Sequence, residues 1–248
     1  MIAFLGMYDL PHARTANDRL WAAIRQHLGH GPEDLTRSTD PWTIWTSPDL
    51  LLAQTCGLPY RAKLHDRVTL VGTPSYDLPD CPPGQYLSYL IKRRDDPRDL
   101  AALARNGRFA FNDPLSQSGW AAPLAHMAQH GLAPDRLLET GGHQNSVLAV
   151  LRGKADFAAI DAVTLLMIGD DDPDAMAFLK VFNKTDPTPG LPFITKKGRD
   201  PGPIATAIEK AIDALARSDR LTLRLNGLVQ IPIEAYLDQP IPPAPGEG

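Results

Sequence analysis

Short apolar runs of strand type alternate along the chain with segments of helical period, and this alternation constrains the fold more than any other feature of the sequence. It is the pattern of βα units arranged around mostly parallel sheets. We expect strands at residues 2–5, 50–53, 68–72, 86–92, 108–112, 137–140, 157–160, 179–182 and 192–195. The alternation therefore predicts an α/β protein.

The gaps between these runs contain apolar stripes with the spacing of helices. One stripe covers residues 20–28 and stops at Gly29, a residue type that often ends a helix. Another covers residues 204–215 and follows Asp200 and Pro201, which we expect to be its N-cap and its first helical residue.

The composition excludes several classes of protein. The chain has 248 residues, of which 43% are hydrophobic and 22% charged, as is ordinary for a globular protein. A net charge of −4 argues against the broad basic surface that nucleic acids require, so an anionic ligand must be attracted locally. The sequence has no glycine-rich phosphate loop, metal-ligand cluster or Ser-His-Asp arrangement, and we expect no cofactor, no bound metal and no catalytic residue.

The first residues do not resemble a targeting signal. They lack a basic leader, a long apolar run and a small-residue cleavage site. Apolar stretches elsewhere fall short of the roughly 18 residues of a transmembrane helix. From the chain as written we therefore expect a cytoplasmic protein that does not insert into a membrane.

Two strand-like segments, 86–93 and 190–196, each follow a proline or glycine turn and run into a basic segment. If they are crossovers between lobes, the middle of the chain forms one lobe and the two ends form the other. We accordingly expect lobe 1 to comprise 1–88 and 193–240 and lobe 2 to comprise 89–192. The Pro-rich and Gly-rich residues 241–248 are expected to form a flexible tail.

A Ser-rich turn at residues 116–119 follows the expected strand at 108–112 and opens a helix. The first backbone N–H groups of a helix lack internal partners and carry the positive end of its dipole. Together with the hydroxyls of Ser116 and Ser118 they could form a pocket for an anion. Plain N-capping by either serine explains the same residues equally well.

A second segment leads from a strand through a glycine turn to His143 at a helix start, and then through another strand to Asp161. In open α/β sheets, ligands bind outside the carboxyl ends of strands, where Ser116, His143 and Asp161 would all lie. A structural role for His143 and N-capping by Asp161 are alternatives that the sequence leaves open.

These segments resemble a known family. The arrangement Asp-Pro-x-Ser-x-Ser-Gly at 113–119, Gly-x-His at 141–143, Arg-Gly-x-Ala-Asp at 152–156 and a strand ending in Asp161 is similar to the PhnD-like phosphate, phosphite and phosphonate substrate-binding proteins of ABC importers. The resemblance implies a two-lobed type 2 periplasmic-binding-protein fold. Each lobe would be a mostly parallel sheet flanked by helices, and two strands would cross between the lobes.

The resemblance also implies roles for individual residues. Ser116, Gln117 and Ser118 would hold phosphoryl oxygens, His143 would add a donor and Asp161 would face the ligand. All the expected ligand contacts are Ser116, Gln117, Ser118, Gly119, His143, Asp161, Tyr8, Thr55 and Tyr86. A second acid for an aminoalkyl tail is not evident. The resemblance places Cys56 and Cys81 on one lobe, where a disulfide between them could form.

Three functions are compatible with this sequence. The first is capture of a small oxyanion or organophosphonate by lobe closure, by a monomer that works with ABC-transporter membrane subunits. This role would require a periplasmic location. The alternatives are a cytoplasmic ligand sensor or regulatory subunit on the same fold, and an enzyme of pyrimidine-precursor type on the same fold.

Overall fold

The computed structural model describes residues 1–246 and divides into two compact units. The first comprises Met1–Gln85 and Pro189–Asp238, and the second comprises Tyr86–Thr188 and the chain from Gln239 onwards. The chain therefore passes between the units near 85/86 and 188/189, a few residues before the expected boundaries, and again near 238/239. Of the expected tail, residues 247 and 248 lie outside the described residues.

The first unit contains a five-stranded sheet with the order β1-β2-β11-β3-β12. Its strands are β1 (Ile2–Phe4), β2 (Leu50–Gln54), β11 (Phe193–Lys196), β3 (Val68–Tyr76) and β12 (Leu225–Val229). β1 and β2 pair in parallel, whereas β11 is antiparallel to β2 and β3, and β12 is antiparallel to β3. The expectation of a mostly parallel sheet is therefore wrong, because β11 inserts between two strands that run the opposite way. β12 was not expected.

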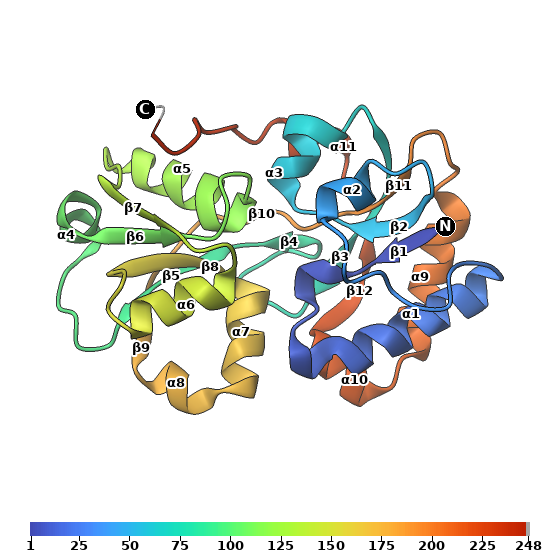
Figure 1. The fold of residues 1–248 in the computed structure, drawn as a ribbon, viewed down its shortest axis with the longest axis horizontal. Helices are drawn as coiled ribbons and strands as arrows, with labels where there is room; N and C mark the ends of the chain where they lie inside the picture. Colours follow the sequence, from blue (N-terminus) through green and yellow to red (C-terminus); the bar gives the residue numbers. More distant parts are fainter. Residues whose placement is uncertain (247–248) are drawn as a thin grey trace. The chain divides into compact units, whose positions relative to one another are not determined.

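Helices flank this sheet (Figure 1). They are η1 (Gly6–Tyr8), η2 (Pro11–Ala13), α1 (Arg14–Leu28), α2 (Pro41–Trp45), α3 (Gly57–Pro59), η3 (Tyr60–Leu64), α9 (Gly202–Ala214), α10 (Arg217–Leu223) and α11 (Ile233–Leu237). α1 stops at Gly29, whose positive φ of 79° confirms the expected helix end. α9 begins one residue later than expected: Pro201 is the N-cap, and the Asp200 side chain accepts from the N–H of Gly202.

The core of the first unit forms where β2 is covered on both faces. All five residues of β2 are buried, as is usual for a central strand. Ile194 of β11 and the rings of Tyr60 and Tyr236 pack into the same cluster, and the two rings lie edge to face with their centroids 5.2 Å apart. Each fully buried large side chain contributes about 1.5–3 kcal/mol to folding.

The second unit contains a sheet with the order β7-β6-β8-β5-β9. Its strands are β7 (Arg136–Glu139), β6 (Arg108–Phe111), β8 (Phe157–Asp161), β5 (Ser88–Arg93) and β9 (Leu179–Lys184). β6 is parallel to β7 and β8, whereas β5 is antiparallel to β8 and β9. This sheet is also mixed. Its three parallel strands β6, β7 and β8 point their carboxyl ends to the same edge.

The helices of the second unit are α4 (Leu100–Asn106), η4 (Gln117–Ala121), α5 (Ala122–Gln129), α6 (His143–Leu151), α7 (Ala162–Asp171) and α8 (Pro173–Ala177). α5 and α6 both contact the sheet, and Figure 1 shows them on opposite sides of it. Phe109, Phe157 and Trp120 lie in the core between these layers. A separate two-stranded sheet pairs β4 (Gln85–Tyr86) with β10 (Thr188–Pro189).

Cys56 and Cys81 do not form the disulfide that the resemblance suggested. Cys56 is the N-cap of α3, Cys81 lies in the turn before β4, and both keep their thiols.

Candidate functional site

The turn after β6 is fixed by its own polar side chains. Asp113 accepts from the backbone N–H of Leu115 at 2.6 Å through its carboxylate and from that of Ser116 at 3.0 Å through its carbonyl. Ser116 is the N-cap of η4, and its hydroxyl accepts from the N–H of Gly119 at 2.9 Å. The capping role that the sequence left open for Ser116 is therefore present.

Ser118 is engaged with a residue from a different helix. Its hydroxyl lies 2.9 Å from Nε2 of His143, the first residue of α6. Its carbonyl accepts from the hydroxyl of Ser88 at 2.8 Å. Gly141, with a φ of 78°, allows the sharp turn that brings the start of α6 here. The two helix starts that the sequence singled out are thus joined by a side-chain hydrogen bond.

Gly119 makes the close approach between these segments possible. A Cβ atom at this position would stand 1.8 Å from Oδ1 of Asn112 and 3.3 Å from Cε1 of His143. Among the described residues, Oδ1 of Asn112 is buried and has no hydrogen-bond partner. Rotation of this amide by 180° would present its N–H₂ group at the same point. Asn112 therefore belongs to the cluster, although it was not among the expected contacts.

His143 is uncharged at neutral pH. Desolvation by burial lowers its pKa to about 4, and the backbone of Ala159 offsets this only in part. A neutral imidazole donates from one nitrogen and accepts at the other. If Nε2 donates to Ser118, the serine keeps its own hydroxyl proton for another acceptor.

Asp161 ends β8 and is buried, with 2% of its surface exposed. Its carboxylate caps α7 by accepting from the N–H of Thr164 at 2.9 Å. β5 places Ser88 opposite Asp161, and Ser88 in turn bonds to Ser118. Capping and a position beside the Ser-rich turn therefore coexist. Ser88 was also missed, because nothing in the local sequence sets it apart from other strand residues.

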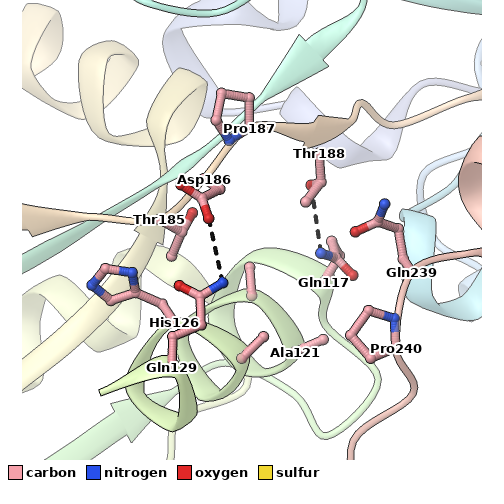
Figure 2. A pocket seen from close by; sticks show the side chains of 12 residues that line it. Gln117, Ala121, His126, Gln129, Thr185, Asp186, Pro187, Thr188, Gln239 and Pro240 are labelled. Carbon is pink, nitrogen blue, oxygen red and sulfur yellow. Dashed lines mark hydrogen bonds between the residues drawn. The ribbon is translucent and has the colours of Figure 1, made fainter.

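The remaining expected contacts of the second unit are Gln117 and Tyr86. The side-chain N–H₂ group of Gln117 lies 3.4 Å from the hydroxyl of Thr188, to which it donates (Figure 2). Tyr86 ends β4 and is buried. The amide N–H₂ group of Gln117 is thus engaged with β10.

Two expected contacts, Tyr8 and Thr55, belong to the first unit. Tyr8 is buried, and its ring packs edge to face on Tyr76 at 5.1 Å. Thr55 follows β2 and is fully buried, and its hydroxyl has no hydrogen-bond partner among residues 1–246. Its backbone N–H donates to the carbonyl of Pro192 at 3.0 Å.

The structure brings together the Ser-rich turn, His143 and Asp161 at the carboxyl ends of β6, β7 and β8. These ends supply hydroxyls, a neutral imidazole and the N–H groups of two helix starts, a set of donors suited to an anion with several oxygens. Across residues 1–246 there is no group of three or more metal-ligating side chains. In the same range, no helix is both long and apolar enough to cross a membrane.

Comparison with solved structures shows the fold. A binding-protein component of an ABC phosphonate transporter from Pseudomonas aeruginosa aligns over 95% of this chain and 82% of its own, with 17% identity and a TM-score of 0.76. PhnD1 from Prochlorococcus marinus, in complex with methylphosphonate, aligns over 95% and 94%, with 15% identity and a TM-score of 0.70. The expected two-lobed type 2 periplasmic-binding-protein fold is confirmed.

Fold likeness does not by itself identify a ligand. A Xanthomonas citri protein whose structure contains bound ATP aligns over 95% of this chain and 92% of its own, with 14% identity and a TM-score of 0.67. A search of curated proteins found no match to the sequence. The family described as "ABC transporter, phosphonate, periplasmic substrate-binding protein" matches residues 52–231. Because this match covers most of its length, the chain belongs to the family of periplasmic substrate-binding proteins of phosphonate ABC transporters.

Proposed function

We propose that the protein binds a small oxyanion or organophosphonate, such as phosphate, phosphite or a phosphonate, at the Ser-rich turn beside His143. The observation that carries this proposal is the hydrogen bond of 2.9 Å between Ser118 and His143, which joins two helix starts at one edge of the sheet. Hydroxyls and backbone N–H groups there would meet the oxygens of one phosphorus centre. The bound methylphosphonate of PhnD1 is an example of such a ligand in a protein of the same fold.

Binding would depend on how the protons are arranged. An anion needs donors, so we infer that in the complex His143 gives up its interaction with the backbone of Ala159 and donates from Nε2 to Ser118, which then donates its own proton to the ligand. The N–H of Ser118 also lies in the first turn of η4, where it has no acceptor within the helix. Asn112 would contribute its N–H₂ group after rotation of the amide.

Asp161 would select for ligands that carry a proton. A carboxylate can only accept hydrogen bonds, so an oxygen that still bears a proton would meet it favourably, whereas a fully ionised oxygen would be repelled. Phosphate, phosphite and methylphosphonate carry such a proton in their monoanions, and sulfate does not. We expect sulfate to bind more weakly than the phosphorus ligands by a factor of ten or more.

Isothermal titration calorimetry with methylphosphonate, phosphite, phosphate and sulfate tests this proposal. Ser118→Ala removes one donor and should weaken binding of the preferred ligand about tenfold to a hundredfold. Ser38→Ala, a change at an exposed serine in the first unit, is the matched control and should leave affinity unchanged. Absence of heat with all four ligands, or equal binding by the Ser118→Ala variant, would contradict the proposal.

We infer a transport role from the family. Its members are periplasmic and bind substrates for ABC transporters, which favours import over the sensor and enzyme alternatives. For this chain, the periplasmic location, the membrane subunits as partners, the monomeric state and the absence of turnover are predictions. Tyr8, Thr55 and Tyr86 likewise stay predicted contacts. Closure on the ligand, expected from the resemblance, would appear as a smaller radius of gyration in solution scattering.

A further inference from the structure

Residues 239–246 follow α11 and belong to the second unit as a proline-rich segment. The half-buried positions of this segment are Gln239, Pro242 and Pro245, and the positions between them are exposed. A spacing of three residues is the period of a polyproline II helix, which takes three residues per turn and has no internal hydrogen bonds. The burial therefore indicates that the segment lies as a polyproline II helix with one edge against the protein.

The segment is attached to η4 through an aromatic side chain. The indole N–H of Trp120 donates to the carbonyl of Pro243 at 3.1 Å, and Trp120 is only 3% exposed with the segment in place. Gln239 and Pro240 line a pocket of about 180 Å³ together with Gln117 of η4 (Figure 2). Surfaces that present aromatic side chains are the ones that bind polyproline II segments. Here the surface and its ligand belong to one chain.

Trp120 connects this segment to the Ser-rich turn. Its ring packs on Phe111 at the end of β6, with the centroids 4.7 Å apart. It directly follows Gly119, whose close approach to His143 leaves little room for η4 to move. A displaced Trp120 would shift Gly119 and Ser118 with it, because all three belong to one π-helical turn. The hydrogen bond between Ser118 and His143 would then change its geometry.

We propose that residues 239–245 are a releasable strap, whose docking on Trp120 holds η4 in the geometry that binds the anion. The proposal rests on the anion site of the proposed function, and it makes Trp120 a positioning residue that acts through η4. A proline-rich segment loses little conformational freedom on docking, since its backbone is already extended. Exposed residues such as Ile241 contribute little to docking, so the strap can also detach. By linkage, a bound anion would favour the docked form.

Calorimetric titration of the whole chain with methylphosphonate tests the positioning role. Trp120→Phe keeps an aromatic ring and removes the N–H donor, and it should weaken binding about threefold to tenfold. Trp21→Phe is the matched control, because it removes an indole N–H that donates to the carbonyl of Pro32 over the same distance, 3.1 Å, in the first unit. This control should leave the affinity unchanged. Equal affinities of Trp120→Phe and wild type would overturn the proposal.

A second pair of variants tests which edge of the strap docks. Pro242→Asp and Pro240→Asp each remove one proline and add the same charge, but only position 242 lies on the half-buried edge. Pro242→Asp should weaken methylphosphonate binding about fivefold or more, because docking would bury part of the charge, whereas Pro240→Asp should stay close to wild type. Equal losses in the two variants would contradict docking with a period of three. Because Pro242 lies outside the core, its variant remains informative if Trp120→Phe fails to fold.

Exchange of the Trp120 indole N–H with deuterated solvent, followed by NMR, measures docking directly. The signal is assigned by its loss in Trp120→Phe, and the indole N–H of Trp21 is the internal reference. Pro242→Asp should speed this exchange, and saturating methylphosphonate should slow it in wild type by the factor by which docking raises affinity, about threefold to tenfold. Exchange that stays constant while methylphosphonate binds would show that the strap does not serve the anion site, and would overturn the proposal. If methylphosphonate binds to no form, the proposed function fails, whereas the exchange rates of wild type and Pro242→Asp still decide whether the strap docks and releases.

Discussion

The helical segment that follows β2 in the first unit and the one that follows β6 in the second begin in comparable ways but satisfy their polar groups differently. Each segment contains a π-helical turn, η3 after α3 in the first unit and η4 before α5 in the second. Such turns are frequent at functional sites. Cys56 makes no side-chain cap at the first start, whereas Ser116 caps Gly119 at the second.

The hydroxyl groups near these two helix N-termini also differ in whether they have a hydrogen-bond partner. Ser118 shares a hydrogen bond with His143, while the hydroxyl of Thr55 is fully buried without a partner in the described part of the chain. A buried unsatisfied hydroxyl costs about 1–3 kcal/mol. The N-terminus of η4 is therefore held in place before any ligand arrives. Near the N-terminus of α3, by contrast, the hydroxyl of Thr55 can form a hydrogen bond only with another molecule or after a rearrangement.

We expect the largest loss of stability and binding from a bulkier side chain at Gly119 in η4. Gly119→Ala places a Cβ atom 1.8 Å from Oδ1 of Asn112, so the amide must move and the turn loses its packing against His143. We expect a loss of about 2–3 kcal/mol in the free energy of unfolding, together with loss of methylphosphonate binding. Urea denaturation followed by circular dichroism measures the first quantity.

Two further variants show whether the clash is the cause. Gly227→Ala in β12 adds a methyl group with no atom within 4 Å and should change stability little. Asn112→Ala combined with Gly119→Ala removes the clashing atom and should restore part of the stability. A double-mutant cycle with no coupling between the two positions would show that Gly119 is required for another reason.

The next largest effect concerns His143 and pH. Its pKa of about 4 in the folded protein lies below the value of about 6.5 expected when unfolded. The unfolded chain therefore binds the proton first, and stability is fully present above pH 6.5 and declines as pH falls toward 4. After allowance for the partial exposure of the side chain, His143 should account for about 2 kcal/mol of this decline.

Unfolding free energies of wild type and His143→Gln, compared between pH 4.5 and 7.5, test this prediction. The variant should have the shallower pH dependence, and His27→Gln, at an exposed position of α1, should match wild type. The same pKa implies that the difference in ligand affinity between wild type and His143→Gln is flat from pH 5 to 8. A change in that difference near pH 6.5 would mean that the imidazole is charged in the complex.

Much of the fold follows from the sequence because the signals are local. The strands at residues 108–111 and 157–161 are apolar runs between turns, and α1 ends at Gly29 as expected. Strand order is different, since the insertion of β11 between β2 and β3 depends on pairing over more than a hundred residues. β12 was missed because an Asn-Gly pair interrupts its apolar run.

The residues of the candidate site likewise divide into those that the local sequence predicts and those that only the folded structure brings together. Ser116 and His143 lie at helix starts that spacing alone predicts. Asn112 and Ser88 join them only through contacts made on folding. Asn112 fits into the space left by Gly119, and the register of β5 on β8 brings Ser88 to the Ser-rich turn. No periodicity along the chain records such contacts. The pairing of Ser118 with His143 likewise depends on the parallel arrangement of β6 and β7.

The smallest expected change in stability compares the hydroxyl of Thr55, near the N-terminus of α3, with that of Ser118 in η4. Thr55→Val removes the unpartnered hydroxyl and keeps the side-chain shape, so the free protein should gain about 1 kcal/mol in unfolding free energy, whereas Ser118→Ala should lose about 1 kcal/mol. Thr195→Val in β11 is the matched control, because its hydroxyl is also buried without a partner in the described residues but is not an expected ligand contact. Both valine variants should be stabilised, and only Thr55→Val should weaken methylphosphonate binding. If Thr55→Val binds as tightly as Thr195→Val, Thr55 is a packing residue, and recognition rests on the second start alone.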